Sequence, residues 1–240
     1  CSQSRGLGDV YKRQMWDNLG RTFAEYPHLQ SLGRHYVEII GIEHLEATRN
    51  EAAVFFAAHL ANWELCPIAA LLQHNYKVHS IYRPPNNNLA DRILMKCRQM
   101  DGTLKPIPKS RSGTRTLFQR LKKKEHIGIL IDQKYNEGVP VSFFHSPAMT
   151  SPAYIQCAEK FNCPLIPLRL ERLEGASFRM TIYPPIERNH KSQDMLLLET
   201  HKMLEEWIRE RPAQWLWLHR RWDSKKLTMN KTEKRETPHE

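Results

Sequence analysis

Residues 52–73 read AAVFFAAHLANWELCPIAALLQ, and this stretch decides the fold class. Ala52 to Ala58 form a short, almost wholly apolar run, which is typical of a strand buried on both faces of a mostly parallel sheet. Asn62 can cap a following helix over residues 63–73, where Pro67 is tolerated because it lies in the early turns. His59 is therefore predicted at the carboxyl end of the strand, in the turn that leads into the helix.

The same alternation of strand and helix continues on both sides of this unit. Further strands are predicted over residues 36–40, 77–82, 126–131, 139–144, 165–171 and 178–183. Helices are predicted over residues 15–26, 43–49, 89–100, 114–124, 153–161 and 195–209. This order predicts an α/β fold with a mixed, largely parallel central sheet flanked by helices.

One domain is predicted over residues 15–222. Residues 1–14, CSQSRGLGDVYKRQ, are polar, lack periodicity and precede Met15, which indicates an adapter- or tag-like segment outside the fold. Residues 223–240 are polar and highly charged and are predicted to form a disordered tail.

Composition narrows the classes of function. The 240 residues include 36 lysines and arginines against 26 acidic residues, a formal charge of +10. Such a surface attracts polyanions, which include nucleic acids, anionic lipids and acidic proteins. The five cysteines show neither a C-x-x-C pair nor metal-ligand spacing, so we expect a reducing compartment and no metal site. No apolar run approaches the roughly 18 residues of a spanning helix.

The sharpest chemical feature is the pair His59 and Glu64, which straddles the strand end and the first helical turn. A carboxylate bonded to one imidazole nitrogen fixes the tautomer and raises the basicity of the other nitrogen, as a general base for an alcohol requires. The alternative is a buried structural histidine beside an ordinary acid at a helix start. Position favours the functional interpretation, because ligands of open α/β sheets bind at the carboxyl ends of strands.

Basic and polar side chains follow other predicted strands. Arg83 ends the strand over residues 77–82, and Arg111 lies with Lys105 and Arg115 in and near a basic loop. Arginine binds phosphate in bidentate fashion, although a solvated basic surface is the alternative for each residue. Asp132 and Gln133 directly follow the buried strand over residues 126–131, where they face a site or close a turn.

The carboxyl-terminal region combines Trp215, Trp217 and Trp222 with the basic run His219-Arg220-Arg221. Amphipathic rings and cations together suit an anionic membrane interface, and they also suit stacking on nucleic acid. The third alternative is that the tryptophans complete the core.

Taken together, these motifs resemble the late acyltransferases of lipid A biosynthesis, the lauroyl and myristoyl transferases. The resemblance rests on His59 to Glu64, Arg83-Pro84, Asp132-Gln133, and Phe143-Phe144 followed by Ala148-Met149-Thr150. It extends from Asn18-Leu19-Gly20-Arg21, through Gly41-Ile42-Glu43-His44-Leu45, to residues 215–222. The chain departs from the family where His145 replaces a common glycine, and where the usual amino-terminal hydrophobic anchor is missing.

The resemblance implies a glycerolipid-acyltransferase-like fold with His59 and Glu64 as catalytic dyad. It implies an acyl-carrier-protein thioester as donor, with no further cofactor, and a hydroxyl of an anionic lipid A precursor as acceptor. The expected location is the cytoplasmic face of the bacterial inner membrane, with a native anchor missing from this chain. Arg83, Arg111, Asp132 and Gln133 would surround the lipid head group and the donor.

Three rival functions stay open from the sequence. An acyltransferase could act on another anionic glycolipid or an aminoacyl lipid, and it could use acyl-CoA as donor. A basic nucleic-acid-binding module would bind oligonucleotides independently of His59 and Glu64. A hydrolase ranks last, because no Gly-x-Ser-x-Gly elbow is present.

Overall fold

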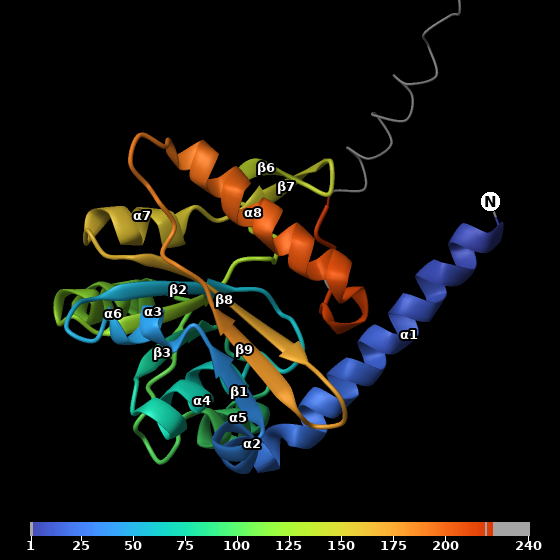
Figure 1. Ribbon diagram of the computed structural model, residues 1–240, viewed down its shortest axis with the longest axis horizontal. Helices are drawn as coiled ribbons and strands as arrows, with labels where there is room; N and C mark the ends of the chain where they lie inside the picture. Colours follow the sequence, from blue (N-terminus) through green and yellow to red (C-terminus); the bar gives the residue numbers. More distant parts are fainter. Residues whose placement is uncertain (1, 219, 223–240) are drawn as a thin grey trace, which may run out of the picture.

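The computed structural model describes residues 2–218 and 220–222. The helices are α1 (Ser2–Glu25), α2 (Leu29–His35), α3 (Ile42–Glu46), α4 (Leu65–His74), α5 (Asn88–Arg98), α6 (Arg111–Lys122), α7 (Ala153–Lys160) and α8 (Gln193–Glu210), with short 3-10 turns η1 (Tyr26–His28) and η2 (Pro212–Gln214). The strands are β1 (Val37–Ile40), β2 (Ala53–Ala57), β3 (Val78–Tyr82), β4 (Ile107–Pro108), β5 (His126–Leu130), β6 (Val139–Phe143), β7 (Ser146–Thr150), β8 (Leu165–Arg172) and β9 (Phe178–Ile182). Figure 1 shows the elements in the colours of the sequence.

Seven strands form the central sheet in the order β1-β9-β8-β2-β5-β3-β4. The five strands from β8 to β4 are parallel to one another, whereas β9 pairs with β8 in antiparallel fashion and β1 runs parallel to β9. The predicted mixed, largely parallel sheet is therefore confirmed. Because β2 lies inside the sheet and is covered on both faces, its side chains are apolar without alternation.

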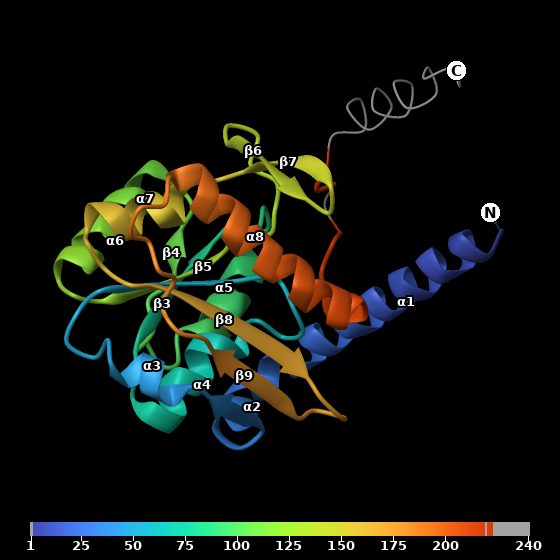
Figure 2. The ribbon, with the colours of Figure 1, turned by 45° about the horizontal axis from the view of Figure 1, so that its top comes forward.

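Helices cover the sheet on both faces, which gives three layers (Figure 2). Val54 and Phe56 of β2 point into the core under α6, α7 and α8, while Ala53, Phe55 and Ala57 point into the core under α2 and α4. Alternate residues of one strand thus enter two separate cores, as the period of two requires.

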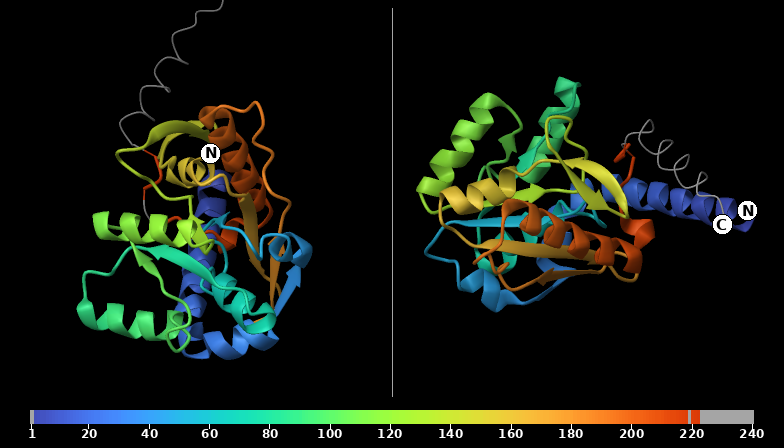
Figure 3. Two further views of the ribbon diagram at one scale, coloured as in Figure 1. Left: turned by 90° about the vertical axis from the view of Figure 1, so that its left-hand side faces the viewer. Right: turned by 90° about the horizontal axis from the view of Figure 1, so that it is seen from above.

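Helix α1 begins within the segment predicted to be an adapter or tag and runs on to Glu25. Its amino-terminal part projects away from the layered body, whereas its carboxyl-terminal part packs against it (Figure 3). Met15, Asn18 and Thr22 are buried there. The helix predicted over residues 15–26 is thus part of a longer one, and the proposed disordered tail lies outside the described residues.

A two-stranded hairpin, β6–β7, lies apart from the main sheet. Phe143 pairs with Ser146, so Phe144 and His145 form a tight turn with φ angles of 50° and 61°. This turn needs left-handed backbone at both positions, where glycine is favoured over other residues. The departure noted at His145 thus falls on a position that a glycine would occupy without strain.

Candidate active site

Strand register places His59 next to Asp132. Strands β2 and β5 are parallel, with Ala57 opposite Leu130. His59 lies two residues after Ala57, and Asp132 lies two residues after Leu130. The Ile131 amide donates to the Ala57 carbonyl, which extends the pairing beyond the strands. Because side chains alternate along extended chain, His59 and Asp132 point to the same side.

The two ring nitrogens of His59 have different partners. Nδ1 lies 2.7 Å from Asp132 Oδ1, and Nε2 lies 3.3 Å from Gln133 Nε2. A carboxylate accepts and an amide nitrogen donates, so the pattern assigns the proton to Nδ1 and a lone pair to Nε2. The His59 ring, which is 14% exposed, presents this lone pair near the exposed Gln133 side chain.

Asp132 is almost completely buried, at 2% exposure. Its second oxygen, Oδ2, accepts a 2.8 Å hydrogen bond from Trp215 Nε1. Burial would raise the pKa of Asp132, but the electrostatic interaction with the His59 ring and the hydrogen bonds from His59 and Trp215 lower it below its ordinary value. Asp132 is therefore ionised at neutral pH and holds the His59 ring in one tautomer.

The carboxyl-terminal segment also fixes the backbone of the His59 turn. The Leu216 amide donates to the His59 carbonyl, and the Ala61 amide donates to the Gln214 carbonyl. Ala61 has a left-handed φ of 51°, and Asn18 Nδ2 donates to its carbonyl. The turn is thus held from α1 and from the chain end, far apart in sequence.

Glu64 does not contact His59, and in this respect the predicted pairing is wrong. Its carboxylate accepts hydrogen bonds from Tyr26 Oη, Trp63 Nε1 and both Nε and Nη2 of Arg98, at 2.5 to 3.1 Å. The physical reason is that Glu64 occupies the N-cap position of α4 without a side-chain cap hydrogen bond, and its carboxylate faces η1 and α5, whereas His59 faces the end of β5. Trp63 lies between the two residues: its Nε1 donates to Glu64, and its ring meets the His59 imidazole edge-on at 4.9 Å between centroids.

A cleft of about 1460 Å³ opens at the carboxyl ends of the parallel strands. Five of the six predicted site residues line it: His59, Glu64, Arg83, Arg111 and Gln133. Arg83 follows β3, and Arg111 begins α6 behind the Ser110 cap. Apolar side chains form much of the remaining wall: Ile81, Leu117, Phe118, Ile129 and Tyr154.

Lys109 adds a further cation to this cleft. Partial burial and the charge of Arg83 lower the pKa of Lys109, and its Nζ lies 4.5 Å from the centre of the Tyr135 ring. Lys105, predicted in the same basic group, lines a different cavity instead. It precedes β4, so it lies at the amino end of that strand.

The tryptophan-rich end completes the core, as the third alternative stated. Trp215 is 6% exposed, and Trp217 and Trp222 pack against the same core cluster. Arg221 is 3% exposed and donates to the Met149 carbonyl and to Thr150 Oγ1, both at 2.6 Å. Trp215 and Arg221 are therefore not a free surface for lipid or bases, whereas Arg220 is exposed and lines the cleft and His219 lies outside the described residues.

Two roles in the site could not be read from local motifs. The family resemblance implies a substrate-binding role for Asp132, whereas the structure makes it the direct hydrogen-bond partner of His59. The sequence predicts no contact between Trp215 and the site. Counting residues past the ends of two neighbouring parallel strands would have paired His59 with Asp132. No comparable signal exists for Trp215, because its contact depends on a loop that follows η2.

Within residues 2–218 and 220–222, no cluster of three or more histidine, cysteine, aspartate or glutamate side chains is arranged to bind a metal ion. None of the helices in this part of the chain combines the length and apolar character needed to cross a bilayer.

Comparison with known proteins identifies a family. The family model for bacterial lipid A biosynthesis acyltransferases matches residues 10–224. The chain is 22% identical over 199 residues to a lipid A biosynthesis palmitoleoyltransferase of Escherichia coli strain K12. It has the same identity over the same length to a lipid A biosynthesis acyltransferase of Shigella flexneri. Each match covers 80% of this chain and 63% of the relative, so the chain spans under two thirds of their length.

Proposed function

Since the chain belongs to the bacterial lipid A biosynthesis acyltransferases, we propose that it moves a fatty acyl group from a thioester to a hydroxyl of a lipid A precursor. The observation that carries this proposal is the His59–Asp132 pair at the mouth of a cleft with apolar walls. A base that is oriented by a buried carboxylate suits the activation of a weakly acidic alcohol. Apolar walls suit acyl chains of donor and acceptor.

His59 acts as the general base in the proposed reaction. Its Nε2 lone pair accepts the proton of the acceptor hydroxyl, which takes the place of the Gln133 amide near this nitrogen. Asp132 stabilises the imidazolium that forms, because its charge lies 2.7 Å from Nδ1. Trp215 keeps the carboxylate in this orientation through its second oxygen.

The acceptor oxygen then attacks the thioester carbonyl carbon. Collapse of the tetrahedral intermediate breaks the bond between carbon and sulfur, and the proton held by His59 passes to the leaving thiolate. The products are an ester and a free thiol. No covalent acyl-enzyme is needed, because His59 serves first as base and then as acid.

The cationic side chains of the cleft bind the phosphate groups of the acceptor. Arg83, Lys109 and Arg111 line the same cavity as His59. Arg83 follows β3, Lys109 follows β4, and Arg111 is the first residue of α6. Glu64 acts as a positioning residue that holds Trp63 against the edge of the His59 ring.

An acyl-carrier protein is the proposed donor partner, and the cytoplasmic face of the inner membrane is the proposed location. A formal charge of +10 supports both, because the carrier protein and the phosphorylated lipid are acidic.

The first test is acyl transfer in detergent from lauroyl- or myristoyl-carrier protein to a phosphorylated, tetra-acylated lipid A precursor. His59→Ala should lower the rate by at least ~100-fold. His35→Ala is the matched control, because His35 is exposed at the end of α2 and should keep the parent rate. Equal rates for the parent and His59→Ala would contradict the base mechanism, and an inactive parent would contradict the proposed activity.

Donor and acceptor specificity need separate measurements. Replacing the carrier-protein thioester by the acyl-CoA thioester should lower kcat/KM if the carrier protein itself is bound. Arg83→Ala should raise KM for the phosphorylated acceptor by about tenfold, the loss expected for one charge-assisted contact. The same variant should leave KM for a dephosphorylated acceptor nearly unchanged, and an equal effect on both acceptors would contradict phosphate binding by Arg83.

A further inference from the structure

A second cavity, of about 620 Å³, lies at the opposite end of the sheet from His59. Its floor contains Tyr76, the early β3 residue His79 and the first β5 residue His126, and all three are buried. His79 and His126 lie at the amino ends of β3 and β5, which are five residues long, so about 16 Å separates these ends from the carboxyl ends near His59. The cavity is therefore separate from the proposed acyl-transfer site.

Positive charge dominates the lining of this cavity. Its lining includes five basic residues and two acidic residues: Arg49, Lys77, Lys105, Arg120 and Lys124, with Asp101 and Glu125. Glu125 is already engaged, because it accepts from Arg120 Nη1 at 2.5 Å and lies 3.3 Å from His79 Nε2. Within the described part of the chain, the ammonium groups of Lys77 and Lys105 have no carboxylate partner. Arg49 is paired with Glu46, so the three exposed lysines Lys77, Lys105 and Lys124 remain beside Asp101, and an anion bound among them would reduce their mutual repulsion.

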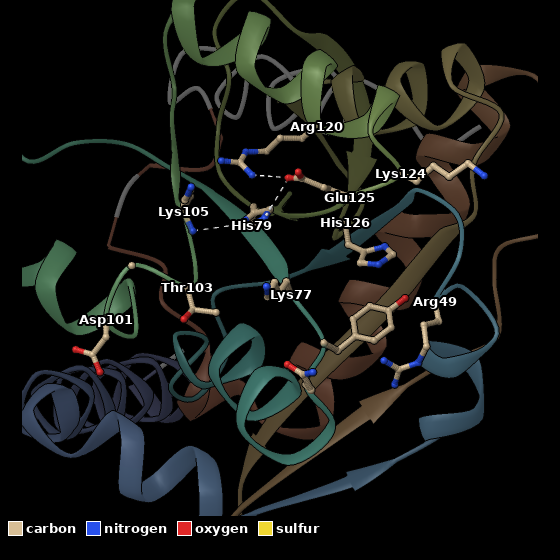
Figure 4. Close-up of a pocket in the computed structure, with 13 residues that line it drawn as sticks. Arg49, Lys77, His79, Asp101, Thr103, Lys105, Arg120, Lys124, Glu125 and His126 are labelled. Atoms are coloured by element: carbon tan, nitrogen blue, oxygen red, sulfur yellow. Dashed lines mark hydrogen bonds and ion pairs between the residues drawn. The ribbon is translucent and has the colours of Figure 1, made fainter.

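The floor offers an unsatisfied polar atom as a second observation. His126 is 7% exposed, and its Nδ1 is buried without a hydrogen-bond partner among the described residues. Its ring stacks on Tyr76 at 4.4 Å between centroids, and Figure 4 shows the imidazole of His126 within the cavity. A buried polar atom without a partner is rare in folded proteins, so the floor of this cavity carries a local cost in stability.

The second imidazole on the floor, that of His79, is held in one tautomer. His79 Nδ1 accepts the Lys105 backbone N–H at 3.1 Å, so its proton lies on Nε2, toward Glu125. Figure 4 shows His79, Glu125 and Arg120 linked along one wall, with Arg49 on another. Arg49 is held by both oxygens of Glu46 at 2.6 and 2.7 Å. The walls are thus pre-formed, while Lys77 and Lys105 have ammonium groups available for a ligand.

We propose that this cavity binds a phosphate group, with Lys77 and Lys105 as cationic contacts beside a floor formed by Tyr76, His79 and His126. Ammonium groups are compact point charges that bind phosphate oxygens well. The volume fits a phosphate with a small organic part. The phosphate can belong to a free metabolite or to a lipid head group, since both present the same oxygens.

Calorimetry with inorganic phosphate and pyrophosphate, at constant ionic strength in chloride, tests this proposal. The parent should bind one anion, and the double variant Lys77→Ala/Lys105→Ala should bind at least ~10-fold more weakly, about 1.4 kcal/mol. Lys122→Ala/Lys123→Ala is the matched control, because it removes two exposed lysines at the end of α6 without touching the cavity. Equal affinity in all three proteins, or no saturable binding by the parent, would overturn the proposal.

A measurement on the unmodified chain guards against a variant that fails to fold. Phosphate should slow chemical acetylation of Lys77 and Lys105 relative to Lys122 and Lys123, as read by mass spectrometry. Equal acetylation rates with and without phosphate would count against the site.

Two further measurements distinguish the source of the phosphate, and distinguish this cavity from the proposed acyl-transfer site. Vesicles that carry a phosphomonoester lipid should compete with inorganic phosphate if the cavity accepts head groups, whereas only soluble phosphates compete if it takes a metabolite. His59→Ala should bind phosphate like the parent. Failure of acyl transfer and failure of phosphate binding are therefore distinguishable.

Discussion

Asp132 receives two hydrogen bonds from groups that can only donate in the proposed state, His59 Nδ1 and Trp215 Nε1. Asparagine has one side-chain oxygen, so Asp132→Asn leaves one donor without an acceptor and removes the charge that stabilises imidazolium. We expect the acyl-transfer rate to fall by at least ~100-fold, with little change in KM. Single-turnover kinetics at saturating acceptor would measure this, and a parent-like kcat would exclude Asp132 from the mechanism.

Adding Trp215→Phe to Asp132→Asn provides an internal control. Phenylalanine keeps much of the aromatic packing but removes the competing donor, so the one amide oxygen that Asp132→Asn introduces can accept from His59 Nδ1. We expect the double variant to be more active than Asp132→Asn alone. A double variant that is worse than either single variant would instead indicate a purely structural role for both side chains.

Glu64 and Arg98 form a buried ion pair whose loss should affect stability more than chemistry. Their side chains are 9% and 17% exposed, and Tyr26 shares the network. Burial and the Glu64 charge raise the pKa of the Tyr26 hydroxyl, so this residue stays a neutral donor. Glu64→Gln leaves Arg98 without its counter-charge and should lower the free energy of unfolding by about 3 kcal/mol.

Urea unfolding measures this change, and a double-mutant cycle tests its cause. Glu64→Gln combined with Arg98→Met should be more stable than Glu64→Gln alone, because no unpaired charge remains buried. Acyl transfer by the folded fraction of Glu64→Gln should fall by less than that of Asp132→Asn. The reverse order would support the pairing of His59 with Glu64 suggested by their spacing.

At the scale of elements, the β6–β7 turn makes a simple stability prediction. His145 is exposed and adopts a φ of 61°, which costs a side chain about 1 kcal/mol relative to glycine. His145→Gly should therefore raise the free energy of unfolding by up to about 1 kcal/mol. Urea unfolding checks this, with Ser142→Gly as the control because Ser142 lies in regular strand, where glycine should destabilise.

The main elements were predictable because their patterns are local. The continuous apolar run of β2 and the similar run at β5 indicate strands covered on both faces, and both were found within a residue or two. Helix α2 was missed because it is short and follows Pro27, which indicates the end of a helix. Strand β7 was not predicted, because a proline, Pro147, lies within it. A two-stranded hairpin tolerates this proline because both of its strands are edge strands.

At the scale of the whole molecule, the site depends on contacts between distant segments. The sequence placed His59, Arg83 and Asp132 at one edge of the sheet, because parallel strands share their carboxyl end. It did not identify which acid meets His59, since β2 and β5 are separated along the chain by α4, β3, α5, β4 and α6. Only the pairing of Ala57 with Leu130 decides that Asp132, and not the nearby Glu64, completes the pair.

The whole fold should also lose stability in mild acid, because three histidines are buried in the neutral form. Burial, together with nearby cations, lowers the pKa of His79, His126 and His201 to about 4. In the unfolded chain these groups titrate near 6.5, so the unfolded state binds more protons between about pH 6.5 and 4. The contribution of the three histidines to the free energy of unfolding is complete above pH 6.5. It declines as the pH falls, by at most about 1.4 kcal/mol per pH unit for each histidine.

Urea unfolding at several values between pH 7.5 and 4.5 measures this decline, and one variant assigns part of it. His201 packs against Phe143, and its Nδ1 donates to the Leu197 carbonyl. Its Nε2 accepts from Thr150 Oγ1, and the ring lies near Arg221, Asp132 and Glu205. His201→Asn removes a titrating group and should give a shallower slope than the parent, although its stability at pH 7.5 is lower. His35→Ala should keep the parent slope, because His35 is exposed. A free energy of unfolding that stays constant from pH 7.5 to 4.5 would contradict the burial of three neutral imidazoles.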